Sequence, residues 1–131
     1  METMALLDGA GVPPSALIWV HAHAEPDHAF HTRAATAGAW VEFDGISKST
    51  VTRHVELVVR MKAQGLLGRV LVSHDAGWYH VGETSGGEFR PFDTLFTGFV
   101  PALRAAGFDE TDIRQLLVTN PRGALERDGR R

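Results

Sequence analysis

The chain has 131 residues and no cysteine, and its 13 basic and 16 acidic residues give a formal net charge of −3. With 44% hydrophobic and 22% charged residues, this composition is typical of one folded, soluble globular domain; it excludes a mainly disordered chain and a large basic surface for nucleic acid. Without cysteine, disulfides and thiolate zinc sites are also excluded, so nitrogen and oxygen ligands would have to hold any metal.

No membrane segment is expected. The N-terminal stretch METMALLDGAGVPP lacks a basic region followed by a long apolar run. No stretch approaches the roughly 20 apolar residues that are needed to cross a bilayer. A cytoplasmic location is therefore the default expectation.

The first elements form a strand-helix unit. Residues 3–7 have helical composition and are followed by the glycines and prolines of GAGVPP, which end helices. Residues 17–20 (LIWV) are a short apolar run typical of a buried strand. Residues 25–37 then indicate a helix with a proline in its first turn and Gly38 after its end.

Two further strands follow. Residues 39–43 (AWVEF) favour a second strand, although Glu42 interrupts its apolar pattern. A Ser/Thr run at 47–50 can cap a helix whose apolar residues recur at helical spacing from Val51. Residues 69–73 (RVLVS) predict the third strand, and a polar, glycine-rich loop, residues 79–92, comes after it.

The C-terminal part is predicted to be helical. An apolar stripe from Leu95 to Leu103 indicates one helix, and Asp109 begins another that Asn120-Pro121 would end. The alternation of strands and helices predicts an α/β fold with parallel strands in a single domain, residues 1–125. Residues 126–131 are a charged tail that we expect to be frayed.

Each predicted strand is followed by polar or ionisable side chains, and ligands collect at this end of parallel sheets. The first strand leads into His21-Ala22-His23, the second into Asp44 and the third into His74-Asp75. If the first strand continued, His21 and His23 would share one face and could bind one cation, although surface or core histidines are the commoner explanation.

The remaining candidates are interpreted individually. Asp75 could ligate a divalent metal or accept a proton, or it could simply cap a turn. An Asx-turn is the favoured interpretation of Asp44. Trp78, Tyr79 and Phe92 could line an apolar substrate pocket, or could equally serve in packing. Three histidines are expected to face solvent from helices: His28, His31 and His54.

Several of these stretches together resemble a known family. They are IWVHAHAEPD, GAWVEFDGI, RVLVSHDAGWY, GGEFRPFDTLFTGFVPALRAAG and DETDIRQLLVTNP, in the order that the family has. The sequence resembles the phosphotriesterase-related metal hydrolases of the amidohydrolase superfamily. This resemblance implies that residues 1–125 form the C-terminal part of a (β/α)8 TIM barrel, with strands six, seven and eight and their helices.

The resemblance also implies roles for two residues. His21 matches a histidine that ends strand six and binds the more exposed metal of a binuclear centre, and Asp75 matches the strand-eight aspartate, which binds the more buried metal and handles a proton. Zinc is the favoured cation, and manganese, cobalt or iron would also fit. His23 departs from the family, where glutamine is usual, and Asp44 is followed by Gly45 instead of histidine, so neither residue receives a transferred role.

The function that the resemblance implies is hydrolysis of a small-molecule ester, lactone or phosphoester by metal-bound hydroxide. The other metal ligands would precede residue 1, so whether this chain is itself an enzyme stays open. Three parallel strands cannot close a barrel, and their open edges would favour self-association or a partner chain. The alternatives are a catalytically inactive, truncated homologue that acts as a structural or assembly module, and a small α/β binding protein.

Overall fold

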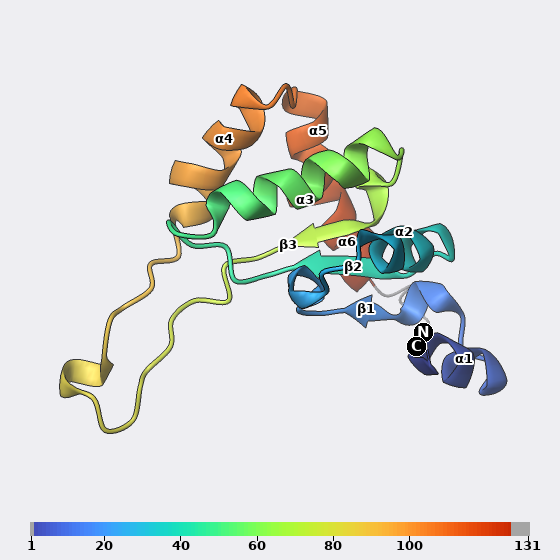
Figure 1. Ribbon diagram of the computed structural model, residues 1–131, viewed down its shortest axis with the longest axis horizontal. Helices are drawn as coiled ribbons and strands as arrows, with labels where there is room; N and C mark the ends of the chain where they lie inside the picture. Colours follow the sequence, from blue (N-terminus) through green and yellow to red (C-terminus); the bar gives the residue numbers. More distant parts are fainter. Residues whose placement is uncertain (1, 127–131) are drawn as a thin grey trace.

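The computed structural model describes residues 2–126 and contains a parallel sheet of three strands in the order β1-β2-β3. The strands are β1 (Ile18–Trp19), β2 (Trp40–Phe43) and β3 (Val70–Val72). Trp19 is in register with Val41, which in turn is in register with Val70. The predicted α/β class with parallel strands is confirmed, and Figure 1 shows the three arrows side by side. Of the predicted charged tail, only Glu126 lies within the described residues.

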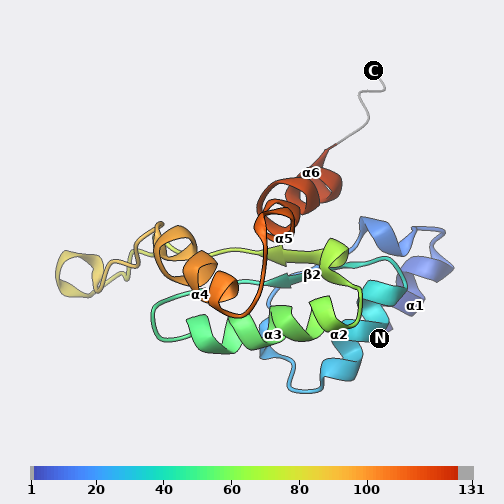
Figure 2. The ribbon, with the colours of Figure 1, turned by 90° about the horizontal axis from the view of Figure 1, so that it is seen from above.

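Two helices connect the strands and cover one face of the sheet (Figure 2). Helix α2 (His28–Thr36) begins later than the predicted residue 25, because the Asp27 side chain caps it by accepting a hydrogen bond from the Ala29 N–H at 2.9 Å. Helix α3 (Val51–Ala63) buries an apolar stripe that includes Leu57, Val58 and Met61, as its helical spacing predicts.

The remaining helices lie at the two ends of the chain. Helix α1 (Glu2–Gly9) precedes the sheet, and a π-helix (Leu95–Phe99) leads into α4 (Val100–Ala105). Helix α5 (Glu110–Arg114) begins at a capping box made by Asp109 and Asp112, which confirms the predicted start. Single 3-10 turns occupy Pro14–Ala16, Ala22–Ala24, Leu67–Arg69 and Thr84–Gly86.

The predicted helix end at Asn120-Pro121 is wrong. A second π-helix (Gln115–Thr119) continues directly into α6 (Asn120–Leu125), with Pro121 in its first turn. Proline is tolerated there because the wider π-turn already interrupts the regular hydrogen-bond ladder. Asn120 is 1% exposed and its amide nitrogen donates to the carbonyl oxygens of Leu67 and Val70, at 2.8 and 2.7 Å. The helix is thereby tied to the start of β3.

The two faces of the sheet are covered differently. Val41 and Phe43 are fully buried on the face that α2 and α3 cover, and Phe43 packs edge-on against the His31 ring of α2. Trp40 points to the opposite face, where its indole lies close to Gly123 of α6. Among the described residues, no helix has both the length and the apolar content needed to cross a membrane.

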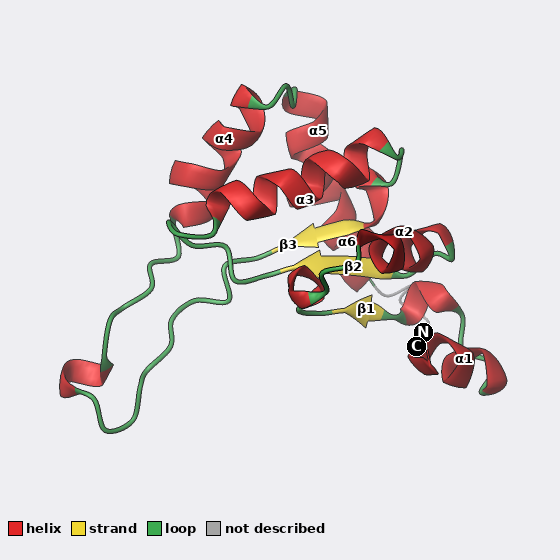
Figure 3. Ribbon diagram, in the orientation of Figure 1, coloured by secondary structure: helices red, strands yellow, loops and turns green. Residues whose placement is uncertain are grey.

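The long loop between β3 and the first π-helix extends away from the sheet (Figure 3). It leaves β3 at the carboxyl end of the strand and returns to the start of the helical segment that packs on α3. The glycine-rich composition of residues 79–92 therefore predicts the loop correctly.

Candidate functional site at the carboxyl ends of the strands

The residues that follow the three strands meet at one edge of the sheet, because all three strands run in parallel. His21 and Asp75 both adopt a left-handed backbone, with φ angles of 56° and 46°. Residues with a Cβ atom seldom take this conformation, and it concentrates at functional sites. Among residues 2–126, three residues other than glycine have this conformation. Two of them are His21 and Asp75, the metal ligands predicted from the sequence.

The prediction that His21 and His23 share one strand face is wrong. Strand β1 ends at Trp19, and His23 lies in the 3-10 turn Ala22–Ala24. The left-handed backbone of His21 turns the chain out of the strand, so strand alternation no longer applies. The two imidazoles instead approach the same carboxylate from different directions.

That carboxylate belongs to Asp44, whose side chain is 6% exposed. Its Oδ2 atom lies 2.7 Å from His21 Nδ1 and accepts a hydrogen bond from the His21 backbone N–H at 3.1 Å. Its Oδ1 atom lies 2.9 Å from His23 Nδ1, although these two atoms are not aligned as a hydrogen bond. The buried carboxylate thus joins the end of β2 to the turn that follows β1.

The predicted Asx-turn at Asp44 is therefore wrong, because the carboxylate turns toward the histidines instead of its own loop. The backbone of Asp44 is fixed from the other side, where its carbonyl oxygen lies 2.6 Å from His54 Nε2. His54 is 1% exposed, so its predicted solvent-facing position is also wrong. Gly45 follows with a φ of 72°, a conformation that glycine takes without strain.

The electrostatics link all three strand ends. The hydrogen bond to Asp44 and the charge of that carboxylate raise the pKa of His21 above its usual value, and the charges of Asp75 and Glu42 add to this effect. Asp75 and Glu42 are thus within electrostatic reach of the His21 ring. Burial lowers the pKa of His23, which favours a neutral ring beside Asp44.

Glu42 is a further acidic residue that sequence reasoning treated only as an interruption of the strand. It is half-buried on β2, and burial raises the pKa of its carboxyl group above the usual value. A hydrogen bond to Ser73 opposes this rise, whereas the charges of Asp44 and Asp75 reinforce it. Its position between the other two strand ends makes Glu42 part of the same electrostatic group.

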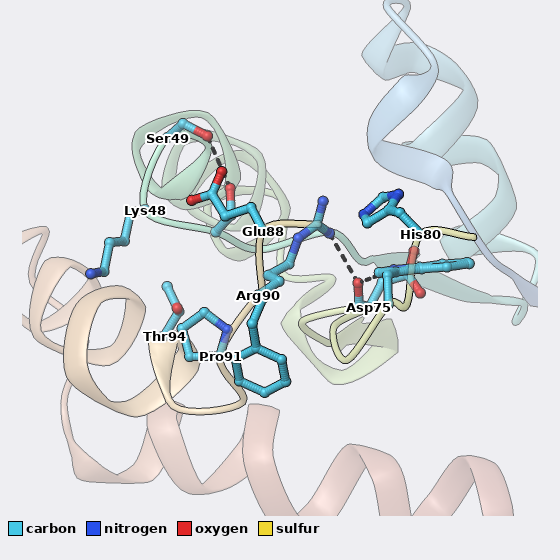
Figure 4. A pocket seen from close by; sticks show the side chains of 11 residues that line it. Lys48, Ser49, Asp75, His80, Glu88, Arg90, Pro91 and Thr94 are labelled. Atoms are coloured by element: carbon cyan, nitrogen blue, oxygen red, sulfur yellow. Dashed lines mark hydrogen bonds between the residues drawn. The ribbon is translucent and has the colours of Figure 1, made fainter. Parts of the chain in front are cut away.

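A cavity of about 920 Å³ opens beside Asp75 (Figure 4). Trp78 lines it and donates its indole N–H to the Asp75 carbonyl oxygen at 2.7 Å. Arg90 donates to the same carbonyl at 2.9 Å, and Lys48 lies on another side of the cavity. The backbone of Asp75 is thus held by two side chains from the long loop.

The predicted pocket differs from this cavity in two respects. Tyr79 is not among the lining residues; its side chain is largely exposed and lies against Gly86. Phe92 lies against Gly77 instead. The lining is mostly polar or charged where an apolar pocket was expected, and its residues are Ser47, Lys48, Ser49, Asp75, Trp78, His80, Glu88, Phe89, Arg90, Pro91 and Thr94.

Two side chains at the strand ends could donate to a divalent metal. Because His21 Nδ1 is already engaged by Asp44, its Nε2 atom is the ring nitrogen left to bind a cation, and the ring is 65% exposed. Asp75 is exposed and supplies carboxylate oxygen. Within residues 2–126, no three acidic or histidine side chains are grouped closely enough to hold a metal. The two donors fit part of a catalytic centre, which takes about three protein ligands.

His31 supports the turn that carries His21. It is 1% exposed, contrary to the prediction that it faces solvent, and its Nε2 atom lies 2.7 Å from the Ala22 carbonyl oxygen. Its ring packs between Trp19 and Phe43, at centroid distances of 5.3 and 5.2 Å. Burial lowers the pKa of His31, which the hydrogen bond to Ala22 only partly offsets.

Acid is therefore expected to destabilise the fold through His31. The pKa of His31 is lower in the folded state than its value of about 6.5 in the unfolded state, so the neutral ring contributes its full stability above that unfolded-state pKa. This stability is lost as the pH falls through the lower pKa of the folded state. The urea midpoint is measured for the wild type and for His31→Gln, each at pH about 7.5 and at pH about 5.5. Glutamine can donate a hydrogen bond to the Ala22 carbonyl oxygen but does not titrate in this pH range. An equal loss in both proteins would contradict the expectation.

The fold and the site define an α/β protein whose polar strand ends meet at one edge of a parallel sheet. The sequence model of the phosphotriesterase family matches residues 1–125, and the chain belongs to this family. Among curated relatives, the phosphotriesterase homology protein of Escherichia coli (strain K12) is 30% identical over 124 residues. That match covers 92% of this chain and 42% of the relative.

Solved structures give the same result. The phosphotriesterase homology protein from Escherichia coli, crystallised with phosphate in its active site, has 30% identity and a TM-score of 0.77, with coverage of 92% of this chain and 42% of that one. An amidohydrolase from Mycoplasma synoviae has 26% identity and a TM-score of 0.79, with coverage of 95% and 38%. The phosphotriesterase from Mycobacterium tuberculosis, at 21% identity and a TM-score of 0.79, shares the fold over 96% of this chain and 41% of its own.

The sequence thus spans about two-fifths of the length of these relatives. Its three-stranded parallel sheet corresponds to a portion of their larger α/β structures. The predicted family is confirmed.

Proposed function

We propose that this chain supplies strands six, seven and eight, together with His21 and Asp75, to a metal-dependent hydrolase of the phosphotriesterase family. The observation that carries the proposal is the pair of left-handed strand-end residues, His21 and Asp75, which are electrostatically coupled at one edge of the sheet. Membership of the family supports the same assignment. Residues 1–125 would then form one structural unit of a barrel.

The side chains have distinct tasks in this proposal. His21 Nε2 and a carboxylate oxygen of Asp75 would be two ligands of a divalent metal, for which zinc is favoured because imidazole and carboxylate suit it. When bound, the metal supplies Lewis acidity and makes water a stronger acid. An Asp75 oxygen would accept the proton of the attacking water and return it to the leaving oxygen, so that an ester bond is replaced by a bond to the water oxygen.

The cavity indicates how a substrate would be held. Trp78 offers an apolar ring and Arg90 offers positive charge beside Asp75, whereas Lys48 adds positive charge on the other side of the cavity. Glu88 and Asp75 balance these charges, so the cavity suits a small polar molecule. A small-molecule ester, lactone or phosphoester is the proposed class of substrate, and a cytoplasmic location is proposed with it.

A second candidate function is a noncatalytic structural or assembly module. Within residues 2–126, no three metal-binding side chains are grouped closely enough to hold a metal, which favours this candidate. The sheet order favours it too, because one side of β1 and one side of β3 are unpaired in this part of the chain. Pairing of these edges with a second copy or with a chain that carries further strands would complete the sheet.

Metal content separates the two candidates. The purified chain is expected to retain about one equivalent of zinc after dialysis and to hydrolyse at least one of a nitrophenyl ester, a lactone and a nitrophenyl phosphotriester. Zinc content is measured by plasma mass spectrometry, and size by sedimentation under the same conditions. A metal-free, inactive chain that sediments as an oligomer would contradict the hydrolase proposal and support the assembly module.

A further inference from the structure

We infer that Asp44 is the positioning residue for His21: its buried carboxylate keeps the proton of the neutral imidazole on Nδ1 and presents a bare Nε2 to the metal site. This inference rests on the proposed function and goes beyond it, since the family resemblance transfers no role to Asp44 and the sequence pattern predicts only an Asx-turn there. The contacts of the Asp44 carboxylate support this inference.

The carboxylate holds His21 at two points. Oδ2 accepts from the His21 backbone N–H at 3.1 Å and lies 2.7 Å from Nδ1 of the same residue. One oxygen atom therefore sets both the backbone and the ring of His21, which matters because the ring itself is 65% exposed and little else would restrain it. The left-handed backbone of His21, with φ of 56°, brings the two contacts to the same oxygen.

Asp44 is itself held in place by neighbouring elements. Its side chain is 6% exposed, and its carbonyl oxygen lies 2.6 Å from His54 Nε2 on α3. His54 Nδ1 lies 2.9 Å from the Thr50 carbonyl oxygen, so each nitrogen of the supporting ring lies close to a carbonyl oxygen, and a ring with a single N–H donates to one of the two. The second carboxylate oxygen faces His23 Nδ1 at 2.9 Å. Burial of the side chain and the contact of its backbone with His54 therefore limit where the carboxylate can move.

The contact with Asp44 determines which ring nitrogen of His21 carries the proton. A carboxylate accepts hydrogen bonds but cannot donate them, so a neutral His21 must carry its proton on Nδ1 when that atom faces Oδ2. The Nε2 lone pair is then free for a cation. The contact of Nδ1 with Oδ2 is a close one, at 2.7 Å. In general, a carboxylate paired with the second ring nitrogen of a ligating histidine fixes its tautomer and orientation, and loss of such a partner typically costs 10–100-fold in metal affinity.

The tautomer can be measured without any metal. The full chain is labelled with 15N at histidine, and long-range 1H–15N spectra are recorded at a pH where the His21 ring is neutral, with His21→Gln used for assignment. The wild type is expected to show protonated Nδ1 and bare Nε2. In Asp44→Ala, His21 is expected to shift toward the Nε2–H form, which prevails for an unrestrained imidazole.

His23→Gln is the matched control, because it removes the ring that faces Oδ1 and leaves the Oδ2 contacts with His21 intact. Its His21 tautomer is expected to match the wild type. A wild-type His21 that is protonated on Nε2, or an Asp44→Ala tautomer equal to that of the wild type, would overturn the inference. If Asp44→Ala does not fold, the wild-type spectrum still decides between the two tautomers.

A titration with Zn²⁺ alone connects the tautomer to the proposed site. Asp44→Ala is expected to bind zinc 10–100-fold more weakly than the wild type, whereas His23→Gln should differ by less than about threefold. Equal zinc affinity in wild type and Asp44→Ala would overturn the positioning role. A wild-type chain that binds no zinc would refute the proposed function, while the tautomer measurement would still judge the contact between Asp44 and His21.

Discussion

Loss of either strand-end ligand, in Asp75→Asn or His21→Gln, is expected to lower zinc affinity by more than about 100-fold. The reason is that removal of a partner outside the metal's own ligand set already costs 10–100-fold, so removal of a direct ligand costs more. His21 and Asp75 follow different strands, and the charge of Asp75 contributes to the raised pKa of the His21 ring; in the proposed function both bind one cation. Competition with a chromophoric zinc chelator measures the affinities.

The double variant gives a sharper test. If both residues bind the same metal, either single change already disables the site, and the double change should lower zinc affinity little further. His80→Gln is the matched control, because His80 lines the cavity but belongs to the long loop and not to a strand end. Independent, additive losses would indicate two separate weak sites, and an effect of His80→Gln as large as that of His21→Gln would place the cation elsewhere in the cavity.

The sheet could be predicted from sequence because its signals are local. Runs such as LIWV and RVLVS are short and mostly apolar, and the structure places β1 and β3 within them. The helix that follows Asn120 was missed because Asn-Pro is normally a stop signal. Its continuation depends on a π-turn and on the carbonyl oxygens of Leu67 and Val70, which are distant in sequence.

The candidate site could be predicted only in part. His21 and Asp75 were found because they stand directly after apolar runs, and the structure brings them within electrostatic reach of one another. The role of Asp44 was missed because its partners lie 21 and 23 residues earlier in the chain, at His23 and His21. His31 and His54 were misplaced because a polar residue on a helix is usually exposed, whereas carbonyl partners compensate their burial here.

Glycine at position 45 gives one further link between sequence and site. The position follows Asp44 and adopts a φ of 72°, and a Cβ atom placed there would lie 3.6 Å from the His23 ring. The left-handed backbone lets the chain turn away after Asp44 while the carboxylate stays directed toward His21.

The structural tie between α6 and β3 is expected to depend on Asn120. Its amide nitrogen satisfies two carbonyl oxygens at the start of β3, and Gln115 Nε2 donates to its side-chain oxygen. Leucine has a similar volume but cannot hydrogen-bond, so Asn120→Leu would remove a donor from the Val70 carbonyl oxygen and an acceptor from Gln115 Nε2, whereas the Leu67 carbonyl oxygen would keep its hydrogen bond from the Val70 N–H. Each buried polar group left unsatisfied costs about 1–3 kcal/mol, and a total loss of about 2–4 kcal/mol in the free energy of unfolding is expected.

Urea denaturation followed by circular dichroism measures this loss, with Val118→Ala as the matched control. Val118 lies on the same helical segment but is exposed, so its change should stay within about 0.5 kcal/mol. Because whole domains are stable by only about 5–15 kcal/mol, the leucine variant should unfold at a clearly lower urea concentration. A midpoint equal to that of Val118→Ala would mean that α6 is held to the sheet by apolar contacts, such as that of Trp40 with Gly123, and not by the buried amide.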